Sequence, residues 1–434
     1  MSSKNKNSTA TITVACAFVF IVFVFCYLYF MQADILALSQ FAWSGGQTHY
    51  NAVIGAVLLT MVFFIIRIGV SSFTDFPRRL HSLVYFPSLV MLGTLTGGTM
   101  QEDGTVTIGT KIWLSVALLV LFAMTARPLS KYRPYESPLS SVSLFSQASW
   151  MNVGLLVLMF MMCLAFGNTD RMTHHKLLME RYVAQGKYDR ALLVAEYDRE
   201  TDSVMTMLRA YSLSVQGKLG ERIFTYPLCG GSRALLPAVS RRERLAFTSD
   251  APLWKHLGAA PRGTVKDAVE FLRLLQRQKK ATPAVDDYLL TAWLLDGNLK
   301  GFAHAVTQCY DMRTDEERAL AAENLEKRRK VLARKIGEKE AADSVREVLL
   351  TPSGAPRKQM ADLPRHYKEA LVLYTHLNTV RVLTYHDSVT DADYEDFLKV
   401  SRAGYPSPAV RKAALRDAYF GTYWYYYEML QEKK

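Results

Sequence analysis

The residues with the chemistry to form a site are few and scattered along the chain. His174 and His175 are adjacent, so on a helix their imidazoles would point about 100° apart, which is poor geometry for holding one metal ion. His366 lies in LPRHYKEAL and could belong to a site, although a histidine that forms a hydrogen bond near the start of a helix is the favoured explanation. No Walker loop, GxGxxG, GxSxG, HExxH or EF-hand loop is present.

The five cysteines form no CxxC pair and no Cys/His spacing typical of metal sites. Cys16, Cys26 and Cys163 lie in apolar segments, where cysteine behaves as a small hydrophobic residue. Cys229 and Cys309 could pair in an oxidising compartment, and the sequence leaves this open. We therefore predict no catalytic residue, no metal site and no cofactor.

The formal net charge of +12 raises the question of an anionic partner. Arg241, Arg242 and Arg244 form a short cluster that could bind an anionic ligand, but a solvated helix end explains it more simply. Membrane proteins also concentrate lysine and arginine near lipid headgroups. Since no nucleic-acid motif accompanies the charge, we expect the lipid bilayer, and no nucleic acid, as a partner.

The first third of the chain is expected to lie in a membrane, because its apolar segments match a bilayer core about 30 Å thick. The first, Thr11–Gln32, is too long for a signal peptide and lacks a clean cleavage site after it. The third is the weakest, because it is short and contains His81, Ser82 and Gly93, and Pro87 would kink it. The five expected spans are about 11–32, 51–70, 80–96, 111–126 and 150–167.

Basic residues between these spans fall on alternating sides, as five crossings require. Lys4 and Lys6 precede the first span, whereas the next loop, 33–50, has neither lysine nor arginine. The later loops continue the alternation with Arg67, Arg78 and Arg79, then Glu102 and Asp103, then Arg127, Lys131 and Arg133. We predict a cytoplasmic N-terminus and place everything after Gly167 outside the cytoplasm.

Arg67 is the nearest case of an ionisable residue within a span. It lies close to the end of its segment, where its stem could let the guanidinium reach the headgroups. Transporters place ionisable groups at mid-membrane, and the expected spans have almost none. We therefore favour a packed anchor. A cavity where Arg67, His81 or the basic residues of 127–133 meet acidic partners would favour an enzyme or a transport component instead.

Residues 168–434 are amphipathic with helical spacing and are expected to form a soluble domain. Tyr182, Gly186, Tyr188 and Ala191 have the offsets of a tetratricopeptide turn, which joins two antiparallel helices. The glycine permits a left-handed backbone at the end of the first helix. The spacing recurs more weakly at Leu213, Gly217 and Leu219 and at Trp293, Gly297 and Leu299.

The interval from Gly186 to Gly217 is 31 residues, near the ideal period of about 34. We therefore predict an all-α fold, in which a bundle of about five transmembrane helices in residues 1–167 precedes a tetratricopeptide-like domain in 168–434. A generic helical bundle is the alternative for the second domain.

Two further segments have clear helical patterns. Asp315–Leu350 is rich in Ala, Glu, Lys and Arg and predicts a long exposed helix or helix pair. The chain should end with a helix from about Pro408 through Tyr419–Tyr427. Tyr423, Tyr426 and Tyr427 would then share one face and pack together, or would stack on a glycan if they were exposed.

Three segments resemble a family of uncharacterised membrane proteins known mainly from Bacteroidota. They are ERIFTYP at 221–227, LPRHYKEAL at 363–371 and FGTYWYYY at 420–427. The resemblance implies apolar spans followed by a helical-repeat domain, and a multi-pass protein of a bacterial inner membrane with that domain in the periplasm. It implies no catalytic residues.

Two functions of different classes follow. The favoured one is a membrane-anchored scaffold whose repeats bind a protein or peptide partner, because stacked helix pairs form extended concave surfaces. The alternative is an envelope enzyme or transport component acting on glycan or lipid. A groove between repeats beside a dry membrane bundle would favour the scaffold.

Overall fold

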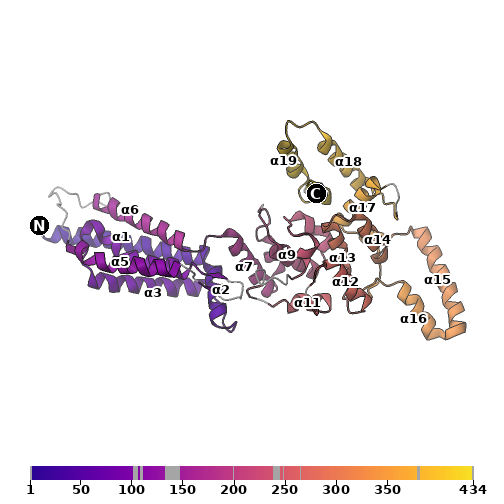
Figure 1. The fold of residues 1–434 in the computed structure, drawn as a ribbon, viewed down its shortest axis with the longest axis horizontal. Helices are drawn as coiled ribbons and strands as arrows, with labels where there is room; N and C mark the ends of the chain where they lie inside the picture. The colour runs from indigo at the N-terminus through magenta and orange to yellow at the C-terminus, as the bar shows by residue number, and fades with distance from the viewer. Residues whose placement is uncertain are drawn as a thin grey trace. The chain divides into compact units, whose positions relative to one another are not determined.

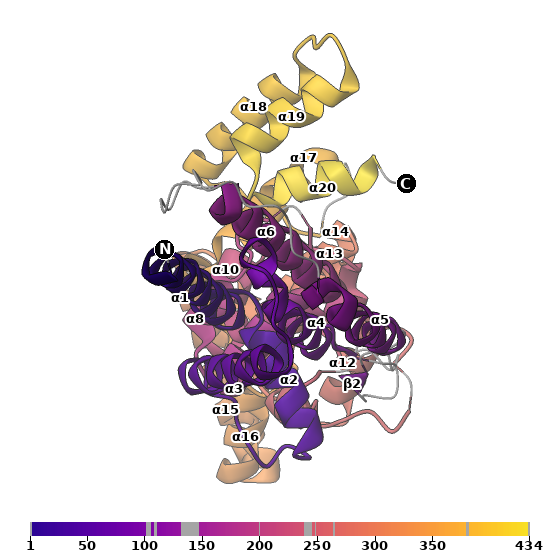
Figure 2. The same cartoon turned by 90° about the vertical axis from the view of Figure 1, so that its left-hand side faces the viewer.

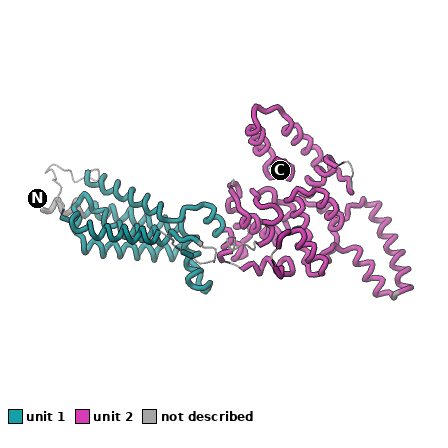
Figure 3. Tube along the Cα trace, viewed as in Figure 1, with its two compact units in different colours: residues 1–178 teal, residues 179–434 magenta. Residues whose placement is uncertain are grey.

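Helices account for almost all of the regular structure, which confirms the predicted all-α class. The computed structural model describes residues 2–100, 106–107, 111–131, 147–198, 200–237, 245–247, 249–263, 265–378 and 382–432. In these residues it has twenty α-helices and two short two-stranded ladders. The chain divides into two compact units, Met1–Leu178 (unit 1) and Met179–Lys434 (unit 2), shown in Figure 3.

Unit 1 consists of long apolar helices that lie side by side (Figure 1). Among the described residues, four helical stretches are long and apolar enough to cross a membrane: Ala10–Met31, Ala52–Phe73, Lys111–Lys131 and Gln147–Phe166. They match four of the five expected spans within a few residues, and they indicate an integral membrane protein. The elements of unit 1 are α1 (Ser2–Cys26), the π-helical turn η1 (Tyr27–Met31), α2 (Ala33–Trp43), α3 (Ala52–Phe73), the 3₁₀ helix η2 (Arg78–Tyr85), α4 (Phe86–Leu95), β1 (Thr99–Met100), β2 (Val106–Thr107), α5 (Lys111–Lys131) and α6 (Gln147–Phe166).

The expected third span, 80–96, is not one continuous helix, so the prediction of five spanning helices is wrong. The chain forms the 3₁₀ helix η2 and then the ten-residue helix α4. Pro87 explains the division, because proline has no N–H to donate and its ring clashes with the preceding helical turn. Proline is tolerated in the first turn of a helix, which is where Pro87 lies in α4.

A buried asparagine of α6 holds the broken segment in place. The Oδ1 atom of Asn152 accepts a hydrogen bond from the Ser82 N–H at 2.7 Å. Its Nδ2 atom donates to the carbonyls of Arg78, at 2.8 Å, and of Ala148, at 2.7 Å. Backbone groups in an apolar layer must be paired within the protein, so Asn152 supplies bonds that a continuous α-helix would have made itself.

Helix α4 is the central helix of unit 1, packed against α3, α5 and α6 (Figure 2). Leu89 and Leu92 are fully buried there. A Cβ atom at Gly93 would lie 2.9 Å from the carbonyl oxygen of Cys163 in α6, so this crossing requires glycine. Gly93, which weakened the prediction of a span, is what lets α4 approach α6 closely.

The far ends of several helices meet around Thr96 and Asn168. The Asn168 N–H donates to the Thr96 carbonyl at 2.9 Å, and the Tyr27 and Thr96 hydroxyls lie 2.8 Å apart. The Gln32 side chain donates to the Asn168 carbonyl at 2.9 Å, and Lys111 Nζ donates to the Phe166 carbonyl at 2.8 Å. The ends of η1, α4 and α6 and the start of α5 therefore lie at the same end of the bundle.

Unit 2 is made of shorter helices with a buried, partly aromatic core. Helix α7 (Arg171–Ala184) crosses the division between the units. The other elements are α8 (Tyr188–Leu193), α9 (Ser203–Val215), α10 (Leu219–Arg222), η3 (Ile223–Thr225), η4 (Gly231–Leu235), α11 (Ala251–Leu257), α12 (Ala268–Arg277), α13 (Ala284–Leu295), α14 (Leu299–Cys309), β3 (Tyr310–Asp311), α15 (Asp315–Ile336), α16 (Glu338–Val348), β4 (Lys358–Gln359), η6 (Met360–Asp362), α17 (Arg365–Leu377), α18 (Ser388–Arg402), α19 (Pro408–Tyr419) and α20 (Tyr423–Gln431).

Three turns of unit 2 share one geometry. Gly186, Gly217 and Gly297 have φ values of 69°, 68° and 68°, which confirms the predicted left-handed glycines. In each turn the N–H after the glycine donates to the carbonyl five residues earlier, as in a Schellman motif. These bonds are Lys187 to Tyr182 (2.9 Å), Lys218 to Leu213 (2.8 Å) and Asn298 to Trp293 (2.9 Å). The following helices differ in length, with 6 residues in α8, 4 in α10 and 11 in α14, so only the third turn joins two full helices.

Two expectations about the later helices have different outcomes. Asp315–Leu350 contains the pair α15 and α16, one of the two forms expected. The final segment is two helices and not the single helix predicted. Gly421, at φ 94°, ends the run after α19, and Thr422 then caps α20 by accepting a hydrogen bond from the Tyr425 N–H. Tyr423 does pack against Tyr426 and Tyr427, with ring centroids 6.3 and 6.1 Å apart.

Candidate functional site

Side chains from widely separated parts of the chain line a groove in unit 2. Its volume is about 730 Å³. Because the lining comes from segments over 160 residues apart, the groove exists only when unit 2 is folded. Its lining residues are Tyr188, Tyr211, Ser214, Val215, Pro252, Lys255, His256, Thr282, Pro283, Ala284, Asp286, Asp287, Cys309, Tyr310, Thr351, Ala355, Pro356 and Lys358.

Rings line much of this groove. Tyr211 contacts Tyr188 and His256 edge to face, with centroids 6.0 and 5.5 Å apart. Burial raises the pKa of Tyr211 to about 12, so its phenol is neutral at physiological pH. Pro252, Pro283 and Pro356 add rigid apolar faces. A surface of rings with a few polar edges suits an apolar or aromatic ligand held by some hydrogen bonds.

Ser214 and His256 form one polar pair in the groove. Ser214 Oγ lies 2.8 Å from His256 Nε2. Burial lowers the pKa of His256 below its ordinary value, which favours the neutral ring and lets Nε2 accept the serine proton. The pair has the distance of a serine and its general base. Burial raises the pKa of the Cys309 thiol, so this cysteine is protonated and not a nucleophile.

Two neighbouring carboxylates have separate roles. Asp286 accepts hydrogen bonds from Thr351 and Ser353, each at 2.6 Å, and from Gln276 at 2.8 Å, so it fixes the segment after α16. Asp287 forms an ion pair with Lys358 at 3.3 Å. Burial raises the pKa of Asp287 above its ordinary value, against the opposing attraction of Lys358. The Asp287–Lys358 pair therefore gives the groove charges of both signs.

A second recess, of about 1120 Å³, lies along α12. Apart from Trp293, its lining comes from the single stretch 259–280. It is basic, since Arg262, Lys266, Arg273 and Arg277 line it, and Arg273 stacks on the Trp293 ring at 4.9 Å. Because one helix and its preceding loop supply most of the wall, this recess depends less on the tertiary fold than the groove does.

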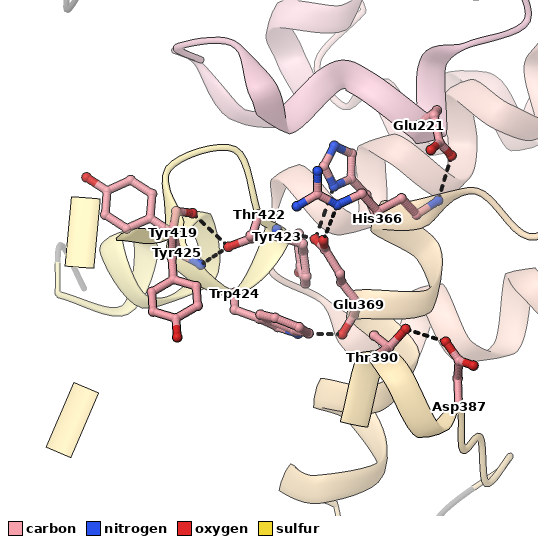
Figure 4. Close-up of polar contacts among 11 residues, drawn as sticks. Glu221, His366, Glu369, Asp387, Thr390, Tyr419, Thr422, Tyr423, Trp424 and Tyr425 are labelled. Atoms are coloured by element: carbon pink, nitrogen blue, oxygen red, sulfur yellow. Dashed lines mark hydrogen bonds and ion pairs between the residues drawn. The ribbon is translucent and has the colours of Figure 1, made fainter. Parts of the chain in front are cut away.

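His366 lies in neither recess but in a buried junction (Figure 4). Its Nδ1 atom is 3.1 Å from Glu369 Oε2, which confirms a histidine that forms a hydrogen bond near the start of α17. Glu369 also accepts from the Tyr423 N–H at 2.6 Å and from Arg365 Nε at 2.8 Å. His366 is fully buried and Glu369 is 3% exposed, so the cluster holds the core together and has no open face for a substrate.

This junction brings together the three segments that carried the family resemblance. The Arg365 N–H donates to Glu221 at 2.7 Å, and the Trp424 indole donates to the Glu369 carbonyl at 2.9 Å (Figure 4). Phe224 packs edge to face on His366 and Tyr423, at 5.2 and 5.0 Å. The segments 221–227, 363–371 and 420–427 therefore meet through packing and hydrogen bonding within one core.

The remaining candidates form no site in the described part of the chain. His174 Nε2 lies 3.1 Å from the Asn168 carbonyl, and no group of metal-ligating side chains is present among the described residues. Cys229 is exposed and Cys309 is buried, and both are free. The other residues singled out in the sequence lie outside the described residues: Glu102, Asp103, Arg133, Arg241, Arg242 and Arg244.

In unit 1, Arg67 and His81 do come together. Arg67 Nη2 lies 3.2 Å from His81 Nε2, and Arg67 is 9% exposed. No described carboxylate forms an ion pair with Arg67. Arg127 and Lys131 are exposed at the end of α5. Arg67 and His81 therefore meet, but no described carboxylate joins them as the alternative function would require.

One family matches part of the chain. It is described as a family of unknown function (DUF6057), and it matches residues 101–261. This stretch contains α5, α6 and the helices through α11, so it includes two spanning helices and Tyr188, Tyr211 and His256 of the groove. Of the three resembling segments, only 221–227 falls inside it. No curated protein and no solved structure matches the chain.

Proposed function

We propose that this chain is a membrane-anchored scaffold whose soluble unit binds a segment of a protein partner in the groove of unit 2. The groove is the observation that supports the proposal most strongly, because the scaffold was expected to have a groove between its repeats. The membrane bundle has apolar spans and offers no carboxylate to Arg67 among the described residues, which supports an anchoring role.

The lining specifies the kind of segment that fits. Tyrosine and proline rings favour an extended peptide with apolar or aromatic side chains, because rings provide large contact area at little entropic cost. Asp287 and Lys358 can exchange their mutual ion pair for hydrogen bonds to the peptide backbone or ion pairs with charged side chains of the peptide. We expect a short peptide segment with at least one aromatic residue.

The three matching glycine turns support a tetratricopeptide-like origin for unit 2. Each has the left-handed glycine and the backbone hydrogen bond that such a turn requires. In the first turn, the predicted small residue, Ala191, is 1% exposed. The short α8 and α10 mark the first two as degenerate units. In this proposal, the groove forms where these units pack against α11 and α13.

We further propose five crossings, with η2 and α4 together making the third. Asn152 holds η2 near one end of α6, and Asn168 bonds to Thr96 just beyond the other end. Fourteen residues separate Asn152 from the end of α6 at Phe166, or about 21 Å along the helix. The broken segment then traverses most of an apolar layer, and residues after Gly167 emerge opposite the N-terminus, in the periplasm of a bacterial inner membrane.

Reporter fusions test this topology. A reporter fused after Lys434 should behave as extracytoplasmic, and one fused after Arg133 should report the cytoplasm. A cytoplasmic signal from the Lys434 fusion would mean that η2 and α4 do not cross.

Site-specific crosslinking in native membranes tests the scaffold. A photo-reactive residue at Lys255, on the groove rim, should capture one protein reproducibly, and the same residue at exposed Lys412 of α19 should not. Tyr188→Ala should abolish capture, whereas Tyr197→Ala, at a residue 89% exposed and outside the groove, should leave it unchanged. A synthetic peptide from the captured protein should then bind the purified chain.

The alternative is an envelope enzyme, and the Ser214–His256 pair is the observation that favours it. It predicts hydrolysis of an ester group on a lipid or glycan by the purified protein without a partner, lost in Ser214→Ala. Such turnover would overturn the scaffold, whereas unchanged peptide binding by Ser214→Ala would support it.

A further inference from the structure

The basic recess along α12 lies next to the groove of unit 2, because the same two stretches of chain line both. The stretch that follows α11 runs from His256, in the groove, to Ala259, in the recess. The stretch that precedes α13 runs from Lys280, in the recess, to Thr282, in the groove. Since His256 and Ala259 are three residues apart, their Cα atoms lie within about 11 Å of each other.

These two stretches cross between the groove and the recess with their backbones in contact. The Thr282 N–H donates to the Leu257 carbonyl at 3.2 Å, and the Thr282 hydroxyl donates to the His256 carbonyl at 2.5 Å. Gly258 has φ 110°, and a Cβ atom at this position would collide with the Lys280 carbonyl oxygen. The groove and the recess are therefore separated by one tight backbone crossing.

Part of the recess is a fixed stack of an arginine on an aromatic ring. The guanidinium carbon of Arg273, on α12, lies 4.9 Å from the ring centroid of Trp293, on α13. Gly301 of α14 packs against Trp293, since a Cβ atom there would lie 2.7 Å from the indole. Stacking engages the face of a guanidinium, whereas its N–H groups point outward in the plane, where they can bind an oxyanion.

The recess has an excess of positive charge, whereas the groove has none. Arg273 and Arg277 lie four residues apart on one face of α12. The recess has only two carboxylates, Asp267 and Glu270, and Asp267 already accepts the Val269 N–H at 2.9 Å. The groove lining is balanced, with two lysines and two aspartates. The cationic residues of the recess are Arg262, Lys266, Arg273, Arg277 and Lys280.

We propose that the partner segment has two parts: an aromatic part that lies in the groove, and an acidic stretch beside it that lies in the recess. Carboxylates of this stretch bind Arg273 and Arg277, since a guanidinium and a carboxylate can form two parallel hydrogen bonds. The positive charge of the recess selects an anionic occupant. Its position next to the groove favours one continuous peptide over a separate ligand. This inference rests on the proposed function, because it specifies the partner of the same groove.

Crosslinking in native membranes tests this continuity. A photo-reactive residue at Gln278, an exposed and uncharged residue of the recess, should capture the same protein as one at Lys255 in the groove. Mass spectrometry should place the Gln278 crosslink in a stretch rich in Asp or Glu, within about ten residues of the Lys255 crosslink. Arg277→Glu should reduce capture from Lys255 about tenfold, because repulsion replaces attraction. Lys412→Glu, the same change of charge on α19, should leave capture unchanged.

A synthetic peptide of eight glutamates tests the recess by itself. The labelled peptide should bind the purified full chain in detergent at low salt, as followed by fluorescence anisotropy, and added salt should weaken the binding. Arg273→Met keeps an apolar chain beside the Trp293 ring but removes the charge, and should weaken binding about tenfold. Arg277→Glu, at an exposed position, is a second variant that leaves the stack intact and should also weaken it. Lys412→Met should bind as the unmodified chain does.

Three outcomes would overturn the inference, and they separate it from the proposed function. Capture from Lys255 that Arg277→Glu leaves unchanged would show that the recess takes no part, while the groove keeps its partner. Tighter Arg273-dependent binding of dioleoylphosphatidylglycerol than of the glutamate peptide would assign the recess to an anionic lipid. No capture from either Lys255 or Gln278 would overturn the proposed function, and this inference with it.

Discussion

Each unit buries an arginine in its core, and the two are held in different ways. In unit 2, Arg209 of α9 is fully buried, and its guanidinium donates to Thr201 Oγ1 at 3.0 Å and to the carbonyls of Pro227 and Ala195 at 2.8 and 3.0 Å. In unit 1, Arg67 has the single acceptor His81 Nε2 among the described residues. Both guanidiniums also lie over a tyrosine ring.

The difference follows from what each fold can offer. Unit 2 has turns whose carbonyls are free of helical bonds, such as the one at Ala195, where φ is 51°. Burial lowers the pKa of Arg209 to about 10, so it stays charged at neutral pH within this ring of acceptors. In unit 1 the helices use their carbonyls internally. Backbone carbonyls therefore pair with the buried arginine of unit 2, whereas among the described residues Arg67 of unit 1 has one side-chain acceptor.

The largest expected effect is a loss of stability in unit 2 when Arg209 is replaced. Arg209→Met should lower the free energy of unfolding by about 3 kcal/mol or more, because the Thr201 hydroxyl and two loop carbonyls lose their donor. Urea unfolding of the full chain in detergent, followed by proteolysis of unit 2, measures it. Arg262→Met, at an exposed residue of the second recess, is the control and should change stability by less than about 0.5 kcal/mol. A loss in Arg67→Met as large as in Arg209→Met would remove the distinction between the two residues.

The next effect concerns how unit 1 satisfies its own backbone. Asn152→Leu should cost about 2 kcal/mol, because the Ser82 N–H and the Arg78 carbonyl lose their partner in an apolar layer. Thermal unfolding in detergent measures the loss. Thr125→Leu is the matched control, since Thr125 is exposed on α5 and bonds to carbonyls of its own helix. Equal midpoints for the two variants would mean that water, and not Asn152, satisfies η2.

Much of the fold could be read from local sequence. Gly186, Gly217 and Gly297 predicted their turns because a left-handed residue at a helix end is a local requirement. The comparable turn at Lys279, with φ 52°, was missed because lysine gives no such signal. The third span was expected to be one helix kinked at Pro87, but the segment divides into the 3₁₀ helix η2 and the short helix α4. Local sequence does not show that Asn152, 65 residues after Pro87, pairs with the backbone of η2 and so permits this division.

The candidate site was much less predictable. The groove depends on Tyr188, His256 and Lys358 meeting, and nothing local in the sequence links them. Arg67 was recognised as unusual, but which way a side chain on α3 points is decided by packing against η2. His366 was predicted correctly as a bonded histidine, because its role depends on Glu369 one turn later in the same helix.

A smaller loss of stability is expected when the glycines in the turns of unit 2 are replaced. Gly186→Val should cost about 1–2 kcal/mol, because a β-branched residue resists positive φ, although no atom lies within 4 Å of its Cβ position. Gly297→Val should cost more, since its Cβ would lie 2.7 Å from Leu430 Cδ2. Circular dichroism during thermal unfolding measures both, and should show no strand signal. Equal costs would mean that strain at φ alone decides the loss.

The smallest effect is a pH dependence confined to the groove of unit 2. Burial places the pKa of folded His256 below the value of about 6.5 expected in the unfolded chain. Between these two values the unfolded chain binds more protons, so stability is fully present above about pH 6.5 and falls as the pH drops through this window. His256→Gln removes the titration while leaving an acceptor for Ser214, so its midpoint should fall less between pH 7.5 and 5.5. His304→Gln, at an exposed histidine of α14, should follow the unmodified chain. If His256→Gln instead follows the unmodified chain at every pH, the Ser214–His256 bond contributes nothing to the acid sensitivity of unit 2.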